Sequence, residues 1–196
     1  MTFVAGLVLA AGGSKRLGRP KQLLPLGEAT LLDHVLSVAR ACPFDQRLSV
    51  IGGGGPEVRG IVDLEGFDVV ENPAFGEGCS SSIAAALRAV DLRADVLVLM
   101  LGDQPGVSAE SVRALIRGRG DADLAACMYD DGRGHPFAFS RARFEDLSGL
   151  HGDKGVWKLM DRAGDRVADV RIPGSIPLDV DTWDDYAAVL AARAPG

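Results

Sequence analysis

Near its start the chain reads FVAGLVLA from Phe3 to Ala10 and AGGSKRLGRPK from Ala11 to Lys21. The first run is short, continuous and apolar, which predicts a buried β-strand. The second run opens with small residues, so its backbone can turn N–H groups inward and cradle phosphate oxygens. A tight turn with solvated charges is the alternative, and composition alone favours an anion site only modestly. The basic side chains of this loop are Lys15, Arg16, Arg19 and Lys21.

Further runs of similar length and apolar character predict six more strands. They cover residues 48–51, 67–70, 96–101, 124–129, 136–139 and 167–172. Segments with helical spacing lie between several of them. The clearest helix follows Thr30, with Asp33 three residues later in the pattern of a capping box. Further helices are predicted over residues 81–90 and 156–162, after Ser108, and after Thr182.

The alternation of strand and helix indicates the α/β class. We expect a three-layer, Rossmann-like fold, with a mainly parallel, twisted sheet and helices on both faces. The glycine run at residues 52–55 precedes Pro56 and is flanked by apolar runs at the spacing of one βα unit. It therefore predicts a loop at the carboxyl end of a strand, and we expect a single domain over residues 1–196.

Composition narrows the class of protein. The net charge of −6 argues against non-specific attachment to nucleic acid or to an anionic membrane. No apolar run approaches the length of about 20 residues that spans a bilayer, and no charged leader precedes an apolar stretch, so we expect a cytoplasmic protein. The three cysteines, Cys42, Cys79 and Cys127, lack the spacing of metal ligands and predict reduced thiols.

Two familiar phosphate loops do not fit the segment after the first strand. A Walker loop needs Lys and then Ser or Thr after its second glycine, whereas Gly18 is followed by Arg19 and Pro20. The dinucleotide fingerprint needs Gly-x-Gly-x-x-Gly, whereas the adjacent Gly12 and Gly13 are followed by four residues before Gly18.

The segment from Leu9 to Gly27 resembles the opening signature of the nucleotidyltransferases of the molybdenum cofactor type. The resemblance rests on Leu-Ala-Ala-Gly at its start, on Arg16, on Gly18 and on the Pro20-Lys21 pair. It implies a glycosyltransferase-A-like nucleotidyltransferase fold, in which Arg16 and Lys21 bind the triphosphate and assist catalysis. The nucleotide contacts that it implies in this loop are Leu9, Ala10, Ala11, Gly12, Gly13, Ser14, Arg16 and Lys21.

Carboxylates suggest a magnesium site. The run 96–101 ends in Gly-Asp-Gln-Pro, and Asp103 at the carboxyl end of a buried parallel strand is placed where open α/β sheets bind ligands. A turn or cap residue is the alternative. Leu-Gly-Asp-Gln-Pro resembles the metal motif of the same family, and the segment Asp179-Val180-Asp181-Thr182 resembles its closing motif. We expect Mg²⁺ on Asp103 and Asp181, with Asp179 as the substitute for Asp181; Asp103 is also expected to be catalytic and to contact the nucleotide.

Two more segments resemble the family. The stretch from Asn72 to Ile83 is similar to a part that lines the nucleotide, although its serines could equally be ordinary helix caps. Gly-His-Pro at 134–136 and Gly-Asp-Lys-Gly at 152–155 resemble segments on the acceptor side, but a solitary histidine is as often structural. The contacts implied are Asn72, Gly78, Ser80 and Ser81 for the nucleotide, and His135 and Asp153 for the acceptor.

The resemblance implies transfer of a nucleoside monophosphate from a nucleoside triphosphate, CTP in preference to GTP, to a phosphate-bearing acceptor such as molybdopterin. Transient contact with a molybdoenzyme maturation factor would accompany that role. Transfer to a sugar phosphate or to phospholactate is the first alternative, and a catalytically silent nucleotide- or cofactor-binding regulator is the second. A nicotinamide-dependent oxidoreductase is disfavoured by the absent dinucleotide fingerprint.

Overall fold

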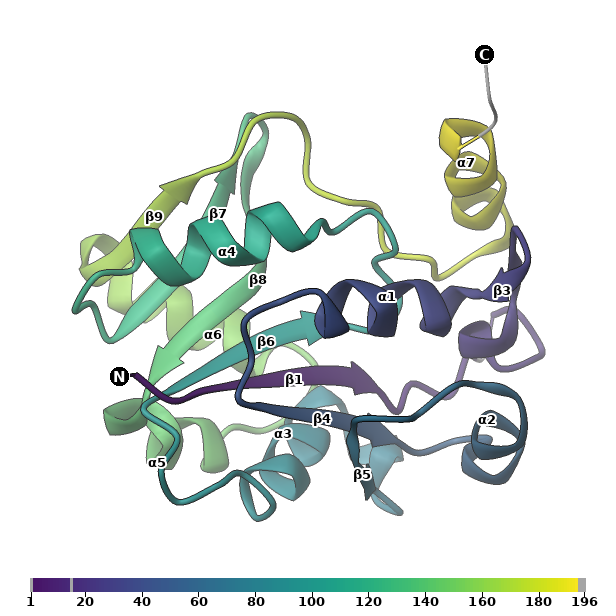
Figure 1. Cartoon of the computed structure of the whole chain (residues 1–196), viewed down its shortest axis with the longest axis horizontal. Coiled ribbons are helices and arrows are strands. Elements are labelled where there is room, and N and C mark those ends of the chain that lie inside the picture. Colours follow the sequence, from purple (N-terminus) through teal and green to yellow (C-terminus); the bar gives the residue numbers. More distant parts are fainter. Residues whose placement is uncertain (1, 15, 194–196) are drawn as a thin grey trace.

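The computed structural model describes residues 2–14 and 16–193. Its centre is a seven-stranded sheet in the order β5-β4-β1-β6-β8-β7-β9 (Figure 1). The strands are β1 Val4–Ala10, β4 Gln46–Ile51, β5 Asp68–Glu71, β6 Val96–Leu101, β7 Leu124–Tyr129, β8 Gly132–Ser140 and β9 Val167–Arg171. All seven predicted strands are present.

The sheet is mainly parallel, as predicted. β1 pairs in parallel with β4 and β6, and β4 pairs in parallel with β5. β8 runs antiparallel to both of its neighbours, β6 and β7, while β9 is parallel to β7. The parallel half of the sheet therefore brings the carboxyl ends of β1 and β6 side by side.

Helices cover both faces of this sheet. Thr30 and Asp33 form the predicted capping box at the first of them, and Thr182 caps the last. Two helices were not predicted: α2 starts inside the glycine-proline run, where propensity is lowest, and α5 has only five residues. The helices are α1 Leu31–Arg40, α2 Gly55–Ile61, α3 Cys79–Leu87, α4 Ala109–Gly118, α5 Phe144–Ser148, α6 Gly155–Ala163 and α7 Trp183–Arg193.

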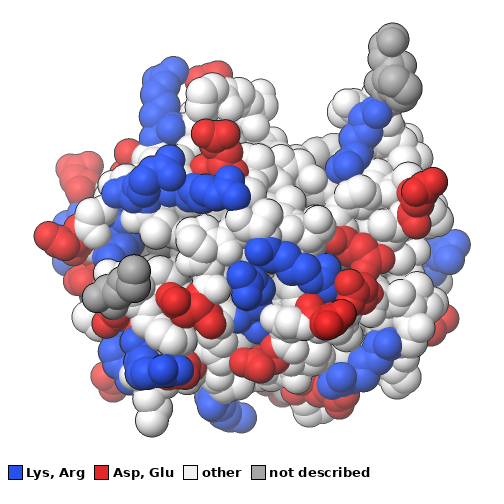
Figure 2. All heavy atoms as spheres, in the orientation of Figure 1, with Lys and Arg blue, Asp and Glu red and all other residues white. Residues whose placement is uncertain are grey.

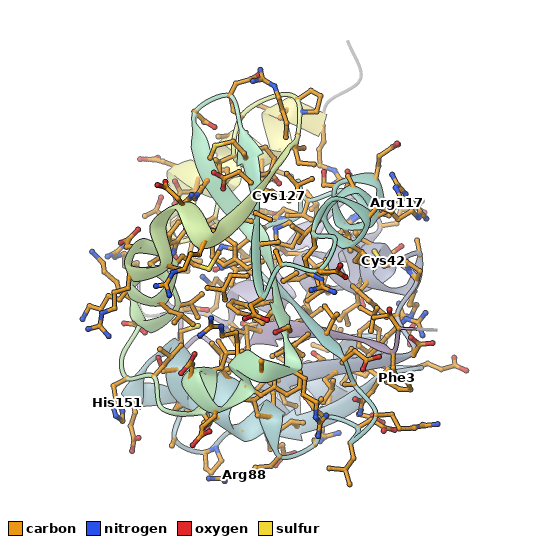
Figure 3. The ribbon with its side chains drawn as sticks, turned by 90° about the vertical axis from the view of Figure 1, so that its left-hand side faces the viewer. Phe3, Cys42, Arg88, Arg117, Cys127 and His151 are labelled. Carbon is orange, nitrogen blue, oxygen red and sulfur yellow. The ribbon has the colours of Figure 1, made fainter. Side chains whose placement is uncertain are left out.

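Two apolar clusters lie between the sheet and the helices on its two faces, and they hold the three layers together. Val8 of β1 and Leu36 of α1 belong to the cluster on the face covered by α1, α2 and α4. Leu7 and Ile83 belong to the cluster on the face covered by α3, α5 and α6. Successive residues of a strand point to opposite faces, so one apolar run supplies both clusters. Figure 3 accordingly has Arg117 of α4 on one side of the sheet and His151, which precedes α6, on the other.

A third, small cluster anchors α7 against the segment after β1. Its buried residues are Leu17, Leu24, Leu26, Leu31, Val180 and Val189. Two short strands that sequence reasoning missed, β2 Pro25–Leu26 and β3 Ala29–Thr30, form a hairpin in this region. Two residues are too few to show the alternation by which a strand is recognised.

Side chains of both charges lie on the surface. Figure 2 shows basic and acidic side chains interspersed over one face, with basic ones gathered over α4. Among residues 2–14 and 16–193, no helix is both long and apolar enough to cross a membrane.

Candidate functional site

A cavity of about 430 Å³ opens at the carboxyl ends of β1 and β6. This volume is within the range of small-molecule sites, and the edge is the one where open α/β sheets bind ligands. Of the predicted site residues, the cavity is lined by Leu9, Ala10, Ala11, Gly12, Gly13, Ser14, Arg16, Lys21, Gly78, Asp103, Asp153 and Asp181.

The loop after β1 is fastened by a glutamine that the sequence did not single out. The Gln22 side-chain Nε2 donates to the carbonyl of Ala10 at 2.5 Å and to that of Gly12 at 3.1 Å. Gln22 is 2% exposed, and its Oε1 has no partner among the described residues. Ser14 has a positive φ of 47°, and its Oγ accepts from the Lys21 backbone N–H at 2.8 Å. These bonds fix the shape of the glycine loop and the position of Lys21 at the start of the 3₁₀ turn Lys21–Leu23.

Lys21 joins the two predicted metal ligands. Its Nζ donates to Asp103 Oδ2 and, at 2.7 Å, to Asp181 Oδ1. Asp103 follows β6 and Asp181 precedes α7, and the Val180 N–H donates to the Asp103 carbonyl at 3.0 Å. The structure therefore brings three predicted residues from three distant segments to one point.

Charge is concentrated at this point. Burial lowers the pKa of Lys21, but the carboxylates of Asp103 and Asp181 outweigh that effect, and the pKa is raised overall. Burial, with Asp103 and Asp181 nearby, raises the pKa of Asp179 to about 6. The lysine thus stays protonated, and it partly neutralises a crowded group of carboxylates.

The donor set suits a hard divalent cation. Two carboxylates approach a single point, and Mg²⁺ is usually bound by one or two carboxylates together with substrate phosphates and waters. In the described part of the chain no group of three or more His, Cys, Asp or Glu residues could bind a metal ion by itself. The site fits a cation that arrives with a phosphate ligand better than one bound by protein alone.

The loop before α6 packs against the N-terminus of α3, and together they form one wall of the cavity. The carboxylate of Asp153 accepts from the Cys79 backbone N–H at 3.0 Å, and Ser80 Oγ donates to the Gly152 carbonyl at 2.6 Å. Gly78, with φ of 103°, permits this contact, because a Cβ there would lie 2.8 Å from Asp153 Oδ1. Asp153, predicted on the acceptor side, thus caps the α3 N-terminus at the cavity wall.

Three predicted nucleotide contacts lie behind this wall rather than on the cavity lining. Asn72 Nδ2 donates to Ser81 Oγ at 2.8 Å and to Ser82 Oγ at 2.9 Å, and Asn72 Oδ1 accepts from the Ala74 N–H. Ser80 is 3% exposed. The polar atoms of Asn72, Ser80 and Ser81 are engaged in holding the segment before α3 in place, which is a supporting position.

His135 also lies off the cavity lining. It is 6% exposed, and its ring centroid is 4.1 Å from that of Phe137 and 5.6 Å from that of Trp157. Burial lowers the pKa of His135 to about 3. The structure thus places a neutral imidazole in an aromatic cluster, and a direct contact with an acceptor stays a prediction.

The burial of His135 predicts a pH dependence of stability. The unfolded chain takes up a proton near pH 6.5 and the folded chain only near pH 3, so the free energy of unfolding falls as pH drops through this window. The expected slope from this residue is about 1.4 kcal/mol per pH unit below pH 6.5. Urea unfolding at pH 7.0 and 5.5 should show that His135→Gln lacks this part of the loss. Equal losses in the variant and the parent protein would contradict the prediction.

Several cavity residues were missed by sequence reasoning. The Phe75 side chain packs against two glycines, since a Cβ on Gly53 would lie 2.9 Å from the Phe75 ring and one on Gly52 would lie 2.7 Å from the Phe75 Cβ. Phe75 and Gln22 both lie inside segments that resemble the family. The aromatic type of Phe75 and the position of Gln22 directly after Lys21 were signals that could have found them. Cys79 lines the cavity too; burial, with Asp153 and Asp103 nearby, raises its pKa to about 11, as expected for an inert thiol. The other unpredicted lining residues are Gly76, Ser82, Leu101 and Gly102.

Two solved structures similar to this chain come from mycobacteria. A homologue of Rv0371c from Mycobacterium sp. strain JC1 is 53% identical, with a TM-score of 0.90 and coverage of 96% of both chains. Rv0371c from Mycobacterium tuberculosis H37Rv, in complex with manganese, is 45% identical, with a TM-score of 0.85 and coverage of 97% of this chain and 100% of the other.

Two of the curated relatives have different activities in their names. Nicotine blue oxidoreductase from Paenarthrobacter nicotinovorans is 30% identical over 78% of this chain and 79% of its own length. Molybdenum cofactor cytidylyltransferase from Escherichia coli K12 is 25% identical over 95% of both chains.

One protein family matches the part of the chain that contains most of β1 and all of β6, at whose ends the cavity opens. The MobA-like NTP transferase domain matches residues 6–167, which is more than half of the chain and includes the glycine loop, Lys21 and Asp103. The predicted resemblance is thereby confirmed. The chain belongs to the family of MobA-like NTP transferase domains.

Proposed function

We propose that this chain, acting as a single domain, transfers a nucleoside monophosphate from a nucleoside triphosphate to a phosphate-bearing acceptor. The observation that carries the proposal is the meeting of the glycine loop, Lys21, Asp103 and Asp181 at one cavity. A loop of small residues beside a lysine suits a triphosphate, and adjacent carboxylates suit the cation that accompanies it.

In the proposed step an acceptor phosphate oxygen attacks the α-phosphorus in line. A new P–O bond forms, the bond between the α-phosphorus and the bridging oxygen breaks, and pyrophosphate leaves. The loop backbone, Arg16 and Lys21 orient the triphosphate and stabilise the charge that develops on its oxygens. Asp103 and Asp181 would bind Mg²⁺, which supplies neutralisation of phosphate charge when bound. The manganese in the mycobacterial relative supports a divalent cation here.

We favour CTP as donor and molybdopterin or the molybdenum cofactor as acceptor. The name of the Escherichia coli relative supports both assignments. His135 and Asp153 would lie on the acceptor side, and transient contact with a molybdoenzyme maturation factor would accompany this role. Transfer to another small phosphate would use the same triphosphate site.

Oxidoreduction is a second candidate, because one relative is a nicotine blue oxidoreductase. The loop after β1 lacks the dinucleotide fingerprint, which counts against a nicotinamide cofactor bound in the usual way. Binding of a nicotinamide dinucleotide would distinguish the two candidates.

A thermal-shift panel tests the proposed function. CTP with Mg²⁺ should raise the melting temperature most among CTP, GTP, ATP and UTP, because a ligand that binds only the folded state stabilises it by mass action. At 100 times its dissociation constant, the expected stabilisation is about 2.7 kcal/mol. NAD and NADP are further arms of the panel and should have no effect. Stabilisation by none of the four triphosphates would overturn nucleotidyl transfer, and a selective shift by a nicotinamide dinucleotide would favour oxidoreduction.

A further inference from the structure

A lysine occupies the position between the two carboxylates assigned to the metal. The Lys21 Nζ donates to Asp103 Oδ2 and Asp181 Oδ1, and its side chain is 12% exposed. In this arrangement the carboxylates are already paired with a cation, and that cation belongs to the chain.

The lysine stem also lies beside the proposed phosphate loop. A Cβ on Gly12 would lie 3.6 Å from Lys21 Cε, so the stem runs along the glycine loop before it reaches the carboxylates. The Lys21 backbone is fixed by Ser14 Oγ, at 2.8 Å from the Lys21 N–H. Because the backbone is fixed and the stem has four flexible carbons, the ammonium can exchange carboxylate for phosphate partners by side-chain rotation alone.

We infer that Lys21 competes with the divalent cation for Asp103 and Asp181 and leaves them when a triphosphate offers its ammonium other oxygens. This inference rests on the proposed function. A divalent cation next to an ammonium on the same carboxylates is opposed by like-charge repulsion, so nucleotide-free protein binds metal weakly. A bound triphosphate draws Lys21 away, and metal and nucleotide binding become positively coupled.

The coupling has a consequence for the resting protein. Without nucleotide, little divalent cation binds in the cavity. Asp103 and Asp181 stay paired with Lys21 until the nucleotide arrives. Lys21 is thus a positioning residue for the metal ligands as well as a phosphate ligand.

Mn²⁺ binding without nucleotide tests the inference, with electron paramagnetic resonance reporting free Mn²⁺. The Lys21→Met variant should bind Mn²⁺ at least about 10-fold more tightly than the parent protein, within the usual range of coupling between sites. The matched control is Arg16→Met, which removes a charge from the same cavity lining; among the described residues Arg16 makes no ion pair with either carboxylate. Its Mn²⁺ affinity should change by less than about 3-fold, because direct competition is absent. Adding Asp103→Asn to Lys21→Met should abolish the gain.

The outcomes separate the inference from the proposed function. Equal Mn²⁺ affinity in the parent protein and in Lys21→Met would overturn competition, even if CTP stabilises both. An equal gain of Mn²⁺ affinity in Arg16→Met would mean that any positive charge on the cavity lining weakens metal binding. That result would also overturn the inference. If no triphosphate raises the melting temperature, the proposed function fails whatever the Mn²⁺ result. Lys21→Gln, which keeps a polar side chain, is the second variant should Lys21→Met fold poorly.

Discussion

The Asp103→Asn variant is expected to lose about 10²- to 10³-fold in turnover while keeping its melting temperature within a few degrees. Asparagine has the shape of aspartate but lacks the charge that would bind Mg²⁺ and pair with Lys21. Stability should change little, because Asp103 stands at a strand end among other carboxylates and its charge helps to raise the pKa of Asp179. Pyrophosphate release with saturating CTP and a verified acceptor is the measurement.

Asp184→Asn is the matched control for this variant. Asp184 is exposed in the first turn of α7 and should leave turnover within about 2-fold, since a charge at a helix N-terminus contributes only about 0.3–1 kcal/mol to stability. Full pyrophosphate release by Asp103→Asn would show that the metal ligands lie elsewhere.

The Phe137→Ala variant should lose about 3–5 kcal/mol of unfolding free energy, a large part of the stability of a domain. Phe137 is fully buried in β8, and its ring lies 4.1 Å from His135 and 5.0 Å from Trp157. Its removal leaves a cavity and also frees the aromatic cluster to shift. The urea midpoint, at unchanged slope, measures the loss.

Phe139→Ala separates the two effects of that change. Phe139 is equally buried on the same face of β8, two residues further on, and should lose a similar free energy. Of these two variants, only Phe137→Ala should also raise the KM for the acceptor, because the Phe137 ring lies against the His135 ring. A loss below about 1 kcal/mol for Phe137→Ala would mean that the core closes around the missing ring.

The sequence predicted the sheet well where the pattern was local. The run 96–101 coincides with β6 because it is continuously apolar and is followed by Gly102. The direction of β8 could not be predicted, since an apolar run carries no signal for the neighbour with which it pairs. α2 was missed because tertiary packing of Val58 outweighs the low helix propensity of its glycines and proline.

The candidate site could be predicted in part. Motifs pointed to Lys21, Asp103 and Asp181 one by one, but no local pattern indicates that one ammonium contacts both carboxylates. Asn72 and Ser81 show the opposite case, because a residue type that suits a ligand can equally bond to its own neighbours. Whether such a residue binds a ligand or bonds to its neighbours depends on the direction of its side chain, which only the folded chain determines.

The pairing of Lys21 with Asp181 spans 160 positions of the chain. Contacts so distant in sequence close large loops, and their entropic cost is met only after the sheet between them has formed. We therefore expect the carboxylate pair to be completed last during folding. A nascent chain on the ribosome would carry the glycine loop and Asp103 long before Asp181 emerges, so the newly made protein would acquire its proposed metal site only after Asp181 has been added.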